Sequence, residues 1–89
     1  MALYEFYGDT CSHCIKMMPL VDKLIEEGIK IEKKEVWKSE ENAALMAPFA
    51  DGKCPGVPFF MNTDSKQWIC GEADEDALRK WAAGDTIEN

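Results

Sequence analysis

The stretch of sequence that decides the fold is Glu5-Phe6-Tyr7-Gly8-Asp9-Thr10-Cys11-Ser12-His13-Cys14. It connects an aromatic and aliphatic run, residues 2–7, to a Gly-Asp turn and then to two cysteines that are three positions apart. A run of this composition that ends in such a turn is typical of a β-strand. Beyond the turn, apolar residues recur every three or four positions, which predicts an amphipathic helix over residues 11–27. Pro19 lies inside this helix, where we expect a kink and not an end.

The rest of the chain alternates between strand and helix patterns. The expected elements are, in order, a strand over residues 29–37 with a charged and solvated edge, a short helix capped by Ser39 that ends before Pro48, a hairpin formed by residues 57–61 and 67–70, and a helix from Asp74 to Gly84. A strand, helix and strand at the start favour two parallel strands joined by a crossover. We therefore predict an α/β fold in one domain, residues 1–89, whose four-stranded mixed sheet has helices on both faces.

Composition narrows the classes of function. The net charge of −7, with basic and acidic residues interleaved, disfavours binding to nucleic acid. No stretch approaches the roughly 20 apolar residues of a membrane span, so we expect no membrane partner. The sequence begins without a basic segment followed by a long apolar run, which favours a cytoplasmic location. We also expect a monomer.

The four cysteines divide into a close pair and two single residues. Because a helix N-terminus stabilises a thiolate, Cys11 is the candidate nucleophile, with a pKa below about 8.5, and Cys14 is the candidate resolving thiol. Half of a zinc site and a pair of packing cysteines remain alternative interpretations of this motif. We expect Cys54 and Cys70 to be small buried hydrophobic residues that form no disulfide framework.

Together, Glu5-Phe6-Tyr7, Cys11-x-His13-Cys14 and Pro19 resemble the active-site segment of the thioredoxin superfamily, and that of protein disulfide isomerase domains in particular. Gly56-Val57-Pro58 resembles the family's cis-proline loop, while the length of the chain is glutaredoxin-like. The resemblance implies a thioredoxin-like fold and a thiol–disulfide oxidoreductase that needs no cofactor beyond its redox-active cysteine pair. Its implied partners are protein disulfides or dithiols and a recycling reductase or glutathione.

Two other functions stay open beside this one. A glutathione-dependent, glutaredoxin-like reductase is the first, although the carboxylate of Asp9 would oppose thiolate formation at Cys11 and repel an anionic tripeptide. A non-enzymatic zinc-binding or interaction module is the second. The direction of electron flow is also open, because a reducing compartment favours reduction of substrates whereas His13 favours a more oxidising couple.

Two residues are candidates for tuning the cysteine pair. A protonated His13 would stabilise the Cys11 thiolate and so make the disulfide a stronger oxidant, unless it is an ordinary surface histidine. Glu5 lies in a strand that we expect to be buried, where its pKa should rise and where it can take the proton from Cys14. The alternative is that Glu5 faces solvent at a margin of the sheet.

Three residues are candidates for binding the substrate. The resemblance implies a cis bond between Val57 and Pro58, which would place the Val57 backbone beside the cysteines to hold an extended substrate segment. The alternative is a proline that opens a strand. Gly71 is expected to leave open space beside this loop, or simply to end a strand. Asp74 is better explained as a helix cap than as a ligand for the amine of glutathione.

Overall fold

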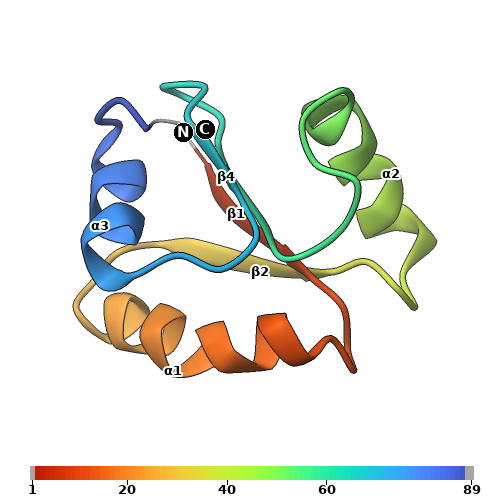
Figure 1. Cartoon of the computed structure of the whole chain (residues 1–89), viewed down its shortest axis with the longest axis horizontal. Coiled ribbons are helices and arrows are strands. Elements are labelled where there is room, and N and C mark those ends of the chain that lie inside the picture. The colour runs from red at the N-terminus through yellow and green to blue at the C-terminus, as the bar shows by residue number, and fades with distance from the viewer. Residues whose placement is uncertain (1, 88–89) are drawn as a thin grey trace.

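The computed structural model of the chain describes residues 2–87, which form one sheet and three helices (Figure 1). The elements are, in chain order, β1 (Leu3–Tyr7), α1 (Ser12–Glu26), β2 (Ile31–Glu35), α2 (Glu40–Ala50), β3 (Phe59–Asn62), β4 (Trp68–Cys70) and α3 (Glu75–Ala83). Within this part of the chain, no helix is long and apolar enough to cross a membrane.

The strands lie side by side in the order β2-β1-β3-β4. β1 and β2 are parallel, with Leu3 opposite Ile31, while β3 runs antiparallel to both β1 and β4. The predicted α/β class with a four-stranded mixed sheet is thereby confirmed. β2 occupies an edge of the sheet and carries the charged run 32–35, which fits the expectation of a solvated edge.

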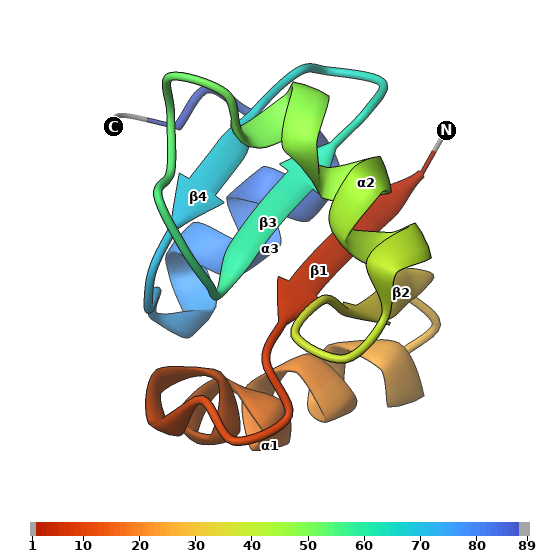
Figure 2. The same cartoon turned by 90° about the vertical axis from the view of Figure 1, so that its right-hand side faces the viewer.

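The sheet separates two apolar cores, because neighbouring residues of a strand point to opposite faces. Helices α1 and α3 cover one face and α2 covers the other (Figures 1 and 2). The buried residues on the α1 and α3 face are Leu3, Met17, Val21, Leu24, Ile31, Phe60, Ile69, Leu78 and Trp81. Those on the α2 face are Phe6, Ala50, Cys54, Phe59 and Met61. The alternation places Glu5 on the same face as Leu3, toward α1.

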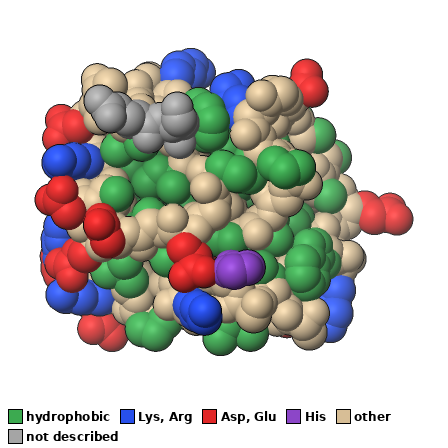
Figure 3. Space-filling model, in the orientation of Figure 1, with side chains coloured by type: hydrophobic (Ala, Val, Ile, Leu, Met, Phe, Trp, Pro, Cys, Tyr) green, Lys and Arg blue, Asp and Glu red, His purple; other side chains and the backbone are tan. Residues whose placement is uncertain are grey.

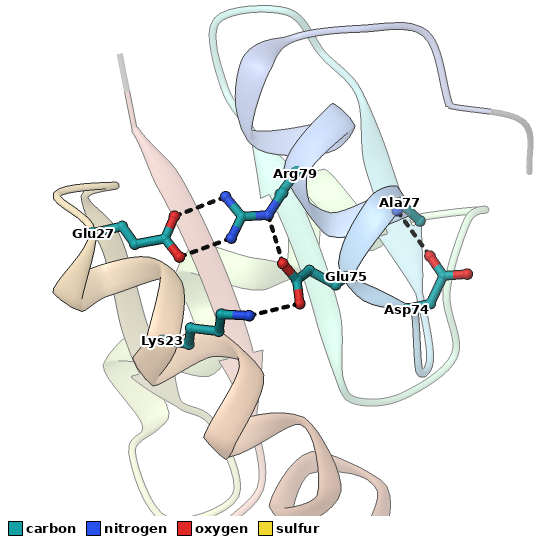
Figure 4. A network of polar contacts seen from close by, with 6 residues as sticks. All are labelled: Lys23, Glu27, Asp74, Glu75, Ala77 and Arg79. Atoms are coloured by element: carbon teal, nitrogen blue, oxygen red, sulfur yellow. Dashed lines mark hydrogen bonds and ion pairs between the residues drawn. The ribbon is translucent and has the colours of Figure 1, made fainter.

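Ion pairs join α1 to α3 on this shared face (Figure 4). The Arg79 guanidinium donates two hydrogen bonds of 2.8 Å to the Glu27 carboxylate and one of 2.9 Å to Glu75. Lys23 Nζ lies 3.0 Å from the same Glu75 carboxylate. Acidic and basic side chains intermingle over α3 and the adjoining end of α1 in Figure 3. Since these groups are solvent-exposed, water screens each pair and its contribution to stability is small.

The expected helix ends are largely confirmed. Cys11 and Asp74 are the N-caps of α1 and α3, and Gly84 ends α3 with a left-handed φ of +86°. α1 continues through Pro19 to Glu26, as expected. The prediction that the second helix ends before Pro48 is wrong, because α2 continues to Ala50. Proline removes only one backbone donor, and the last turn of α2 still packs Phe49 against the apolar core.

The expected strand over residues 29–37 is too long. β2 ends at Glu35, and Trp37 lies in the following loop with an exposed side chain. The hairpin is confirmed as β3 and β4, although β3 begins at Phe59, two residues later than expected, because the loop that precedes it extends through Pro58.

Candidate functional site

The cysteine pair lies where β1 passes through a short turn into α1. Cys11 and Cys14 form a disulfide, and their residues keep 6% and 0% of their surface exposed. The Cys14 N–H donates a hydrogen bond of 3.2 Å to Cys11 Sγ, so the sulfur itself caps the helix. Cys11 is thus the more exposed of the two, as expected, although both are buried. A negative charge on Cys11 Sγ would face a backbone donor and the positive end of the helix dipole.

The loop before β3 faces this disulfide. The bond between Val57 and Pro58 is cis, as expected, and the Val57 carbonyl oxygen lies 3.7 Å from Cys11 Sγ. Gly71, at the end of β4, donates a backbone hydrogen bond of 2.8 Å to the Pro58 carbonyl. Its φ of +95° favours glycine, and no atom lies within 4 Å of the position that a Cβ would occupy. The expected open space at Gly71 is therefore present.

Glu5 is fully buried, which excludes the solvent-facing alternative. Neither carboxylate oxygen has a hydrogen-bond partner among the described residues. Burial raises the pKa of Glu5 from 4.5 to about 7, while the Lys33 ammonium lowers it and the Asp22 carboxylate raises it. Lys33 lies opposite Glu5 in the register of β2 and donates a hydrogen bond of 2.7 Å to Asp22. A buried carboxyl with this pKa can both accept and release a proton near neutral pH.

His13 has a partner that the sequence did not indicate. Its Nδ1 forms an ion pair with the Glu72 carboxylate, which follows Gly71 after the end of β4. The His13 imidazole keeps the pKa of Glu72 below its ordinary value. An imidazolium in this pair shares its charge with a carboxylate, so its effect on the Cys11 sulfur is weaker than that of a free cation.

The loop that follows β2 is hydrogen-bonded to the turn that precedes Cys11. The Glu35 carboxylate accepts hydrogen bonds from the backbone N–H groups of Asp9, Trp37 and Lys38, at 2.9, 3.1 and 2.8 Å. Lys38 Nζ lies 2.6 Å from Asp9 Oδ2. The Asp9 charge, which we expected to oppose the thiolate, is therefore paired with a cation.

The expectation for Cys54 and Cys70 is wrong, because these residues form a second disulfide across 16 positions. Cys54 is buried and lies in the loop between α2 and β3, whereas Cys70 ends β4 and is exposed. The pairing of the two hairpin strands, β3 and β4, is the signal that could have indicated this disulfide. Cys70 lies opposite Phe59, which places it near the segment that begins at Cys54.

The assembled site contains a buried disulfide at a helix N-terminus, a backbone carbonyl against its outer sulfur and a buried carboxyl of raised pKa in the adjoining strand. Asp74 accepts a hydrogen bond of 2.9 Å from the Ala77 N–H, which confirms its role as a helix cap. Within residues 2–87, no three His, Cys, Asp or Glu side chains are grouped to hold a metal ion.

No protein-family model matches the chain, and no curated protein matches its sequence.

Proposed function

We propose that this chain is a thioredoxin-fold thiol–disulfide oxidoreductase that exchanges its Cys11–Cys14 pair with protein disulfides. The observation that carries the proposal is the disulfide at the start of α1, whose outer sulfur lies 3.7 Å from the backbone carbonyl of Val57. An extended substrate segment can pair with that backbone while its own disulfide meets the Cys11 sulfur. The resemblance of residues 5–14 and 56–58 to the thioredoxin superfamily supports the same proposal.

The reaction begins with the reduced chain. The Cys11 thiolate attacks one sulfur of a substrate disulfide, and the other substrate sulfur leaves as a thiolate. The hydrogen bond from the Cys14 N–H and the N-terminus of α1 stabilise the thiolate before the attack. Cys14, as its thiolate, then attacks Cys11 Sγ in the mixed disulfide. The substrate leaves reduced, and the Cys11–Cys14 disulfide forms.

Glu5 is the proposed acceptor of the Cys14 proton. Cys14 is fully buried, so its thiol needs a base inside the protein. Glu5 lies on the face of β1 that is covered by α1, the helix that carries Cys14, and its carboxylate has no competing donor among the described residues. Its pKa of about 7 allows it to take the proton during release and to return it during the reverse reaction.

The proposed direction is reduction of protein disulfides in the cytoplasm, with a reductase that regenerates the dithiol. Glutathione is the alternative electron donor. The charge of Asp9 is paired with Lys38, so this carboxylate repels an anionic tripeptide less than the sequence suggested. The experiment below separates exchange with protein disulfides from a glutathione-dependent reaction.

The test follows Cys11 by mass spectrometry with Cys14→Ser, which removes the resolving thiol. We expect this variant to accumulate a mixed disulfide with a model protein disulfide such as that of insulin, and Cys11→Ser to accumulate none. In a background of Cys54→Ser and Cys70→Ser, reversible oxidation of the remaining pair should change the mass by two hydrogens.

Two results would count against the proposal. If Cys11→Ser reduced insulin as fast as the unmodified chain, Cys11 would not be the nucleophile. If Cys14→Ser formed only an adduct with glutathione and never one with a protein, the glutathione-dependent alternative would replace the proposed function.

A further inference from the structure

The second disulfide connects two segments that contact the start of α1, one at Cys11 and the other at His13. One is the loop before β3, where Cys54 is three residues from Val57, whose carbonyl faces Cys11 Sγ. The other is the end of β4, where Cys70 is two residues from Glu72, the partner of His13. Figure 2 shows the loop after α2 running alongside β4. The Cys54–Cys70 bond therefore ties together both supports of the active site.

Non-covalent contacts also hold these segments, since Val57 packs against the α2-face core that includes Cys54, and Phe59 of β3 pairs with Cys70. The Cys54 N–H donates a hydrogen bond of 3.0 Å to the Ala50 carbonyl, and the Gly71 N–H donates one of 2.8 Å to the Pro58 carbonyl. Gly56 and Gly71 have no atom within 4 Å of the position that a Cβ would occupy, so there is open space beside the chain at both residues. The disulfide is the one covalent restraint between the loop and the strand in the described part of the chain.

The two sulfurs differ in access. The Cys70 residue is exposed, whereas Cys54 is 8% exposed, so we expect a thiolate from solution to approach from the Cys70 side of the bond. Cys54 Sγ lies 3.1 Å from the Gly56 carbonyl oxygen, an acceptor for its S–H once the bond is broken. This second disulfide is more accessible than Cys11–Cys14, both of whose residues are buried.

We propose that Cys54–Cys70 is a second thiol–disulfide exchange site, opened by an external dithiol, and that its opening slows exchange at Cys11. One thiolate of the dithiol attacks the Cys70 sulfur, and the Cys54 sulfur leaves and takes up a proton. The second thiol of the dithiol then displaces Cys70, which also leaves protonated. Two electrons and two protons have moved to this chain, and the dithiol has become a disulfide.

The slowing follows from the position of the bond. With Cys54 and Cys70 separated, the Val57 carbonyl and Glu72 are held near Cys11 and His13 by non-covalent contacts alone, which are the packing of Val57 against the α2-face core, the pairing of β3 with β4 and the contact between His13 and Glu72. A reacting group misplaced by about 1 Å can cost about a hundredfold in rate, and we expect a part of this, roughly tenfold. The rate effect depends on the proposed function, whereas the opening of Cys54–Cys70 does not.

The first measurement uses the unmodified chain, equilibrated with oxidised and reduced dithiothreitol at graded ratios, alkylated and mapped by peptide mass. We expect Cys54 and Cys70 to become alkylated in the folded chain, with Cys70 attacked first. Opening only in denaturant would overturn the proposed exchange site.

The second measurement compares Cys14→Ser with the triple variant that also carries Cys54→Ser and Cys70→Ser, with folding checked by circular dichroism. The rate of mixed-disulfide formation with a peptide disulfide should fall roughly tenfold in the triple variant, while alkylation of Cys11 by iodoacetamide, which needs no docking, should change much less. Equal rates with the peptide would overturn the regulatory role. If the triple variant does not fold, the same rate is taken from Cys14→Ser with alanine in place of Cys54 and Cys70, and an unchanged rate there overturns it equally.

The two proposals can fail separately. If Cys11 formed no mixed disulfide with any substrate while Cys54–Cys70 still opened in the folded chain, the proposed function would fail and the second exchange site would stand.

Discussion

Replacing the buried Glu5 with glutamine should abolish the pH dependence that this side chain gives to stability. A pKa raised from 4.5 to about 7 by burial means that the folded chain keeps a proton on Glu5 which the unfolded chain has already lost. Between these two pH values the folded state binds more protons, so the free energy of unfolding falls as the pH rises. The contribution is fully present below pH 4.5 and is lost as the pH rises through about 7.

The size of this effect follows from the same pKa values. A pKa change from 4.5 to about 7 corresponds to about 3 kcal/mol, at roughly 1.4 kcal/mol per pKa unit. Glutamine cannot ionise, so the stability of Glu5→Gln relative to the unmodified chain should rise by about 3 kcal/mol between pH 4.5 and pH 8. Glu26→Gln, which changes an exposed glutamate at the end of α1, is the matched control and should show no such rise.

The assay is urea unfolding of the oxidised chain at graded pH, followed by circular dichroism. A stability difference between Glu5→Gln and the unmodified chain that is the same at pH 4.5 and pH 8 would refute the reasoning. The variant also tests the proposed chemistry, because loss of the base should slow release of the mixed disulfide by Cys14 near neutral pH. Unchanged release kinetics would remove Glu5 from the mechanism.

Three further outcomes can be checked. Lys33→Met removes the cation that lowers the Glu5 pKa, so this variant should lose the stability contribution of Glu5 at a higher pH than the unmodified chain does; an unmoved midpoint would contradict this electrostatic account. Gly8→Ala places a Cβ 2.3 Å from the Trp37 ring and should cost about 1 kcal/mol in urea unfolding, a cost that adding Trp37→Ala should remove. Replacing both Cys54 and Cys70 with serine removes the second disulfide and frees a loop spanning 16 positions. This should lower the free energy of unfolding by about 3 kcal/mol and the midpoint of thermal unfolding by about 12 °C or more. A loss of stability under about 1 kcal/mol would argue against a formed bond.

The parts of the fold that the sequence predicted well are those with a strong local pattern. The apolar spacing after Cys11 gave α1, and the two runs around residues 62–67 gave the hairpin. The end of α2 was missed because Pro48 signals a break locally, whereas the packing of Phe49 against the sheet outweighs one lost hydrogen bond. The apolar and aromatic residues at 29, 31, 36 and 37 predict a strand that includes Trp37, although Trp37 lies over Gly8 in a loop.

The residues of the candidate site likewise include some that a local sequence pattern predicts and others that it does not. The burial of Glu5 could be predicted because it stands among aromatic residues within one strand. The ion pair between His13 and Glu72 could not, because 59 positions separate the two residues and only the folded sheet brings them together. The bond between Cys54 and Cys70 was missed for a related reason, since neither cysteine has a partner nearby in sequence.

The carboxylate of Glu35 has a practical consequence for anyone who redesigns this chain. The exposed loop after β2 lies beside the turn that carries the reactive cysteines, so a designer would consider inserting a recognition peptide there. Glu35 holds the backbone of that loop and of the turn at Asp9 at once, so a longer loop would displace the turn that carries Cys11. The connection between β3 and β4 lies at the opposite end of β1, because Asn62 pairs with Leu3. Grafts and labels placed there would leave the cysteine pair undisturbed.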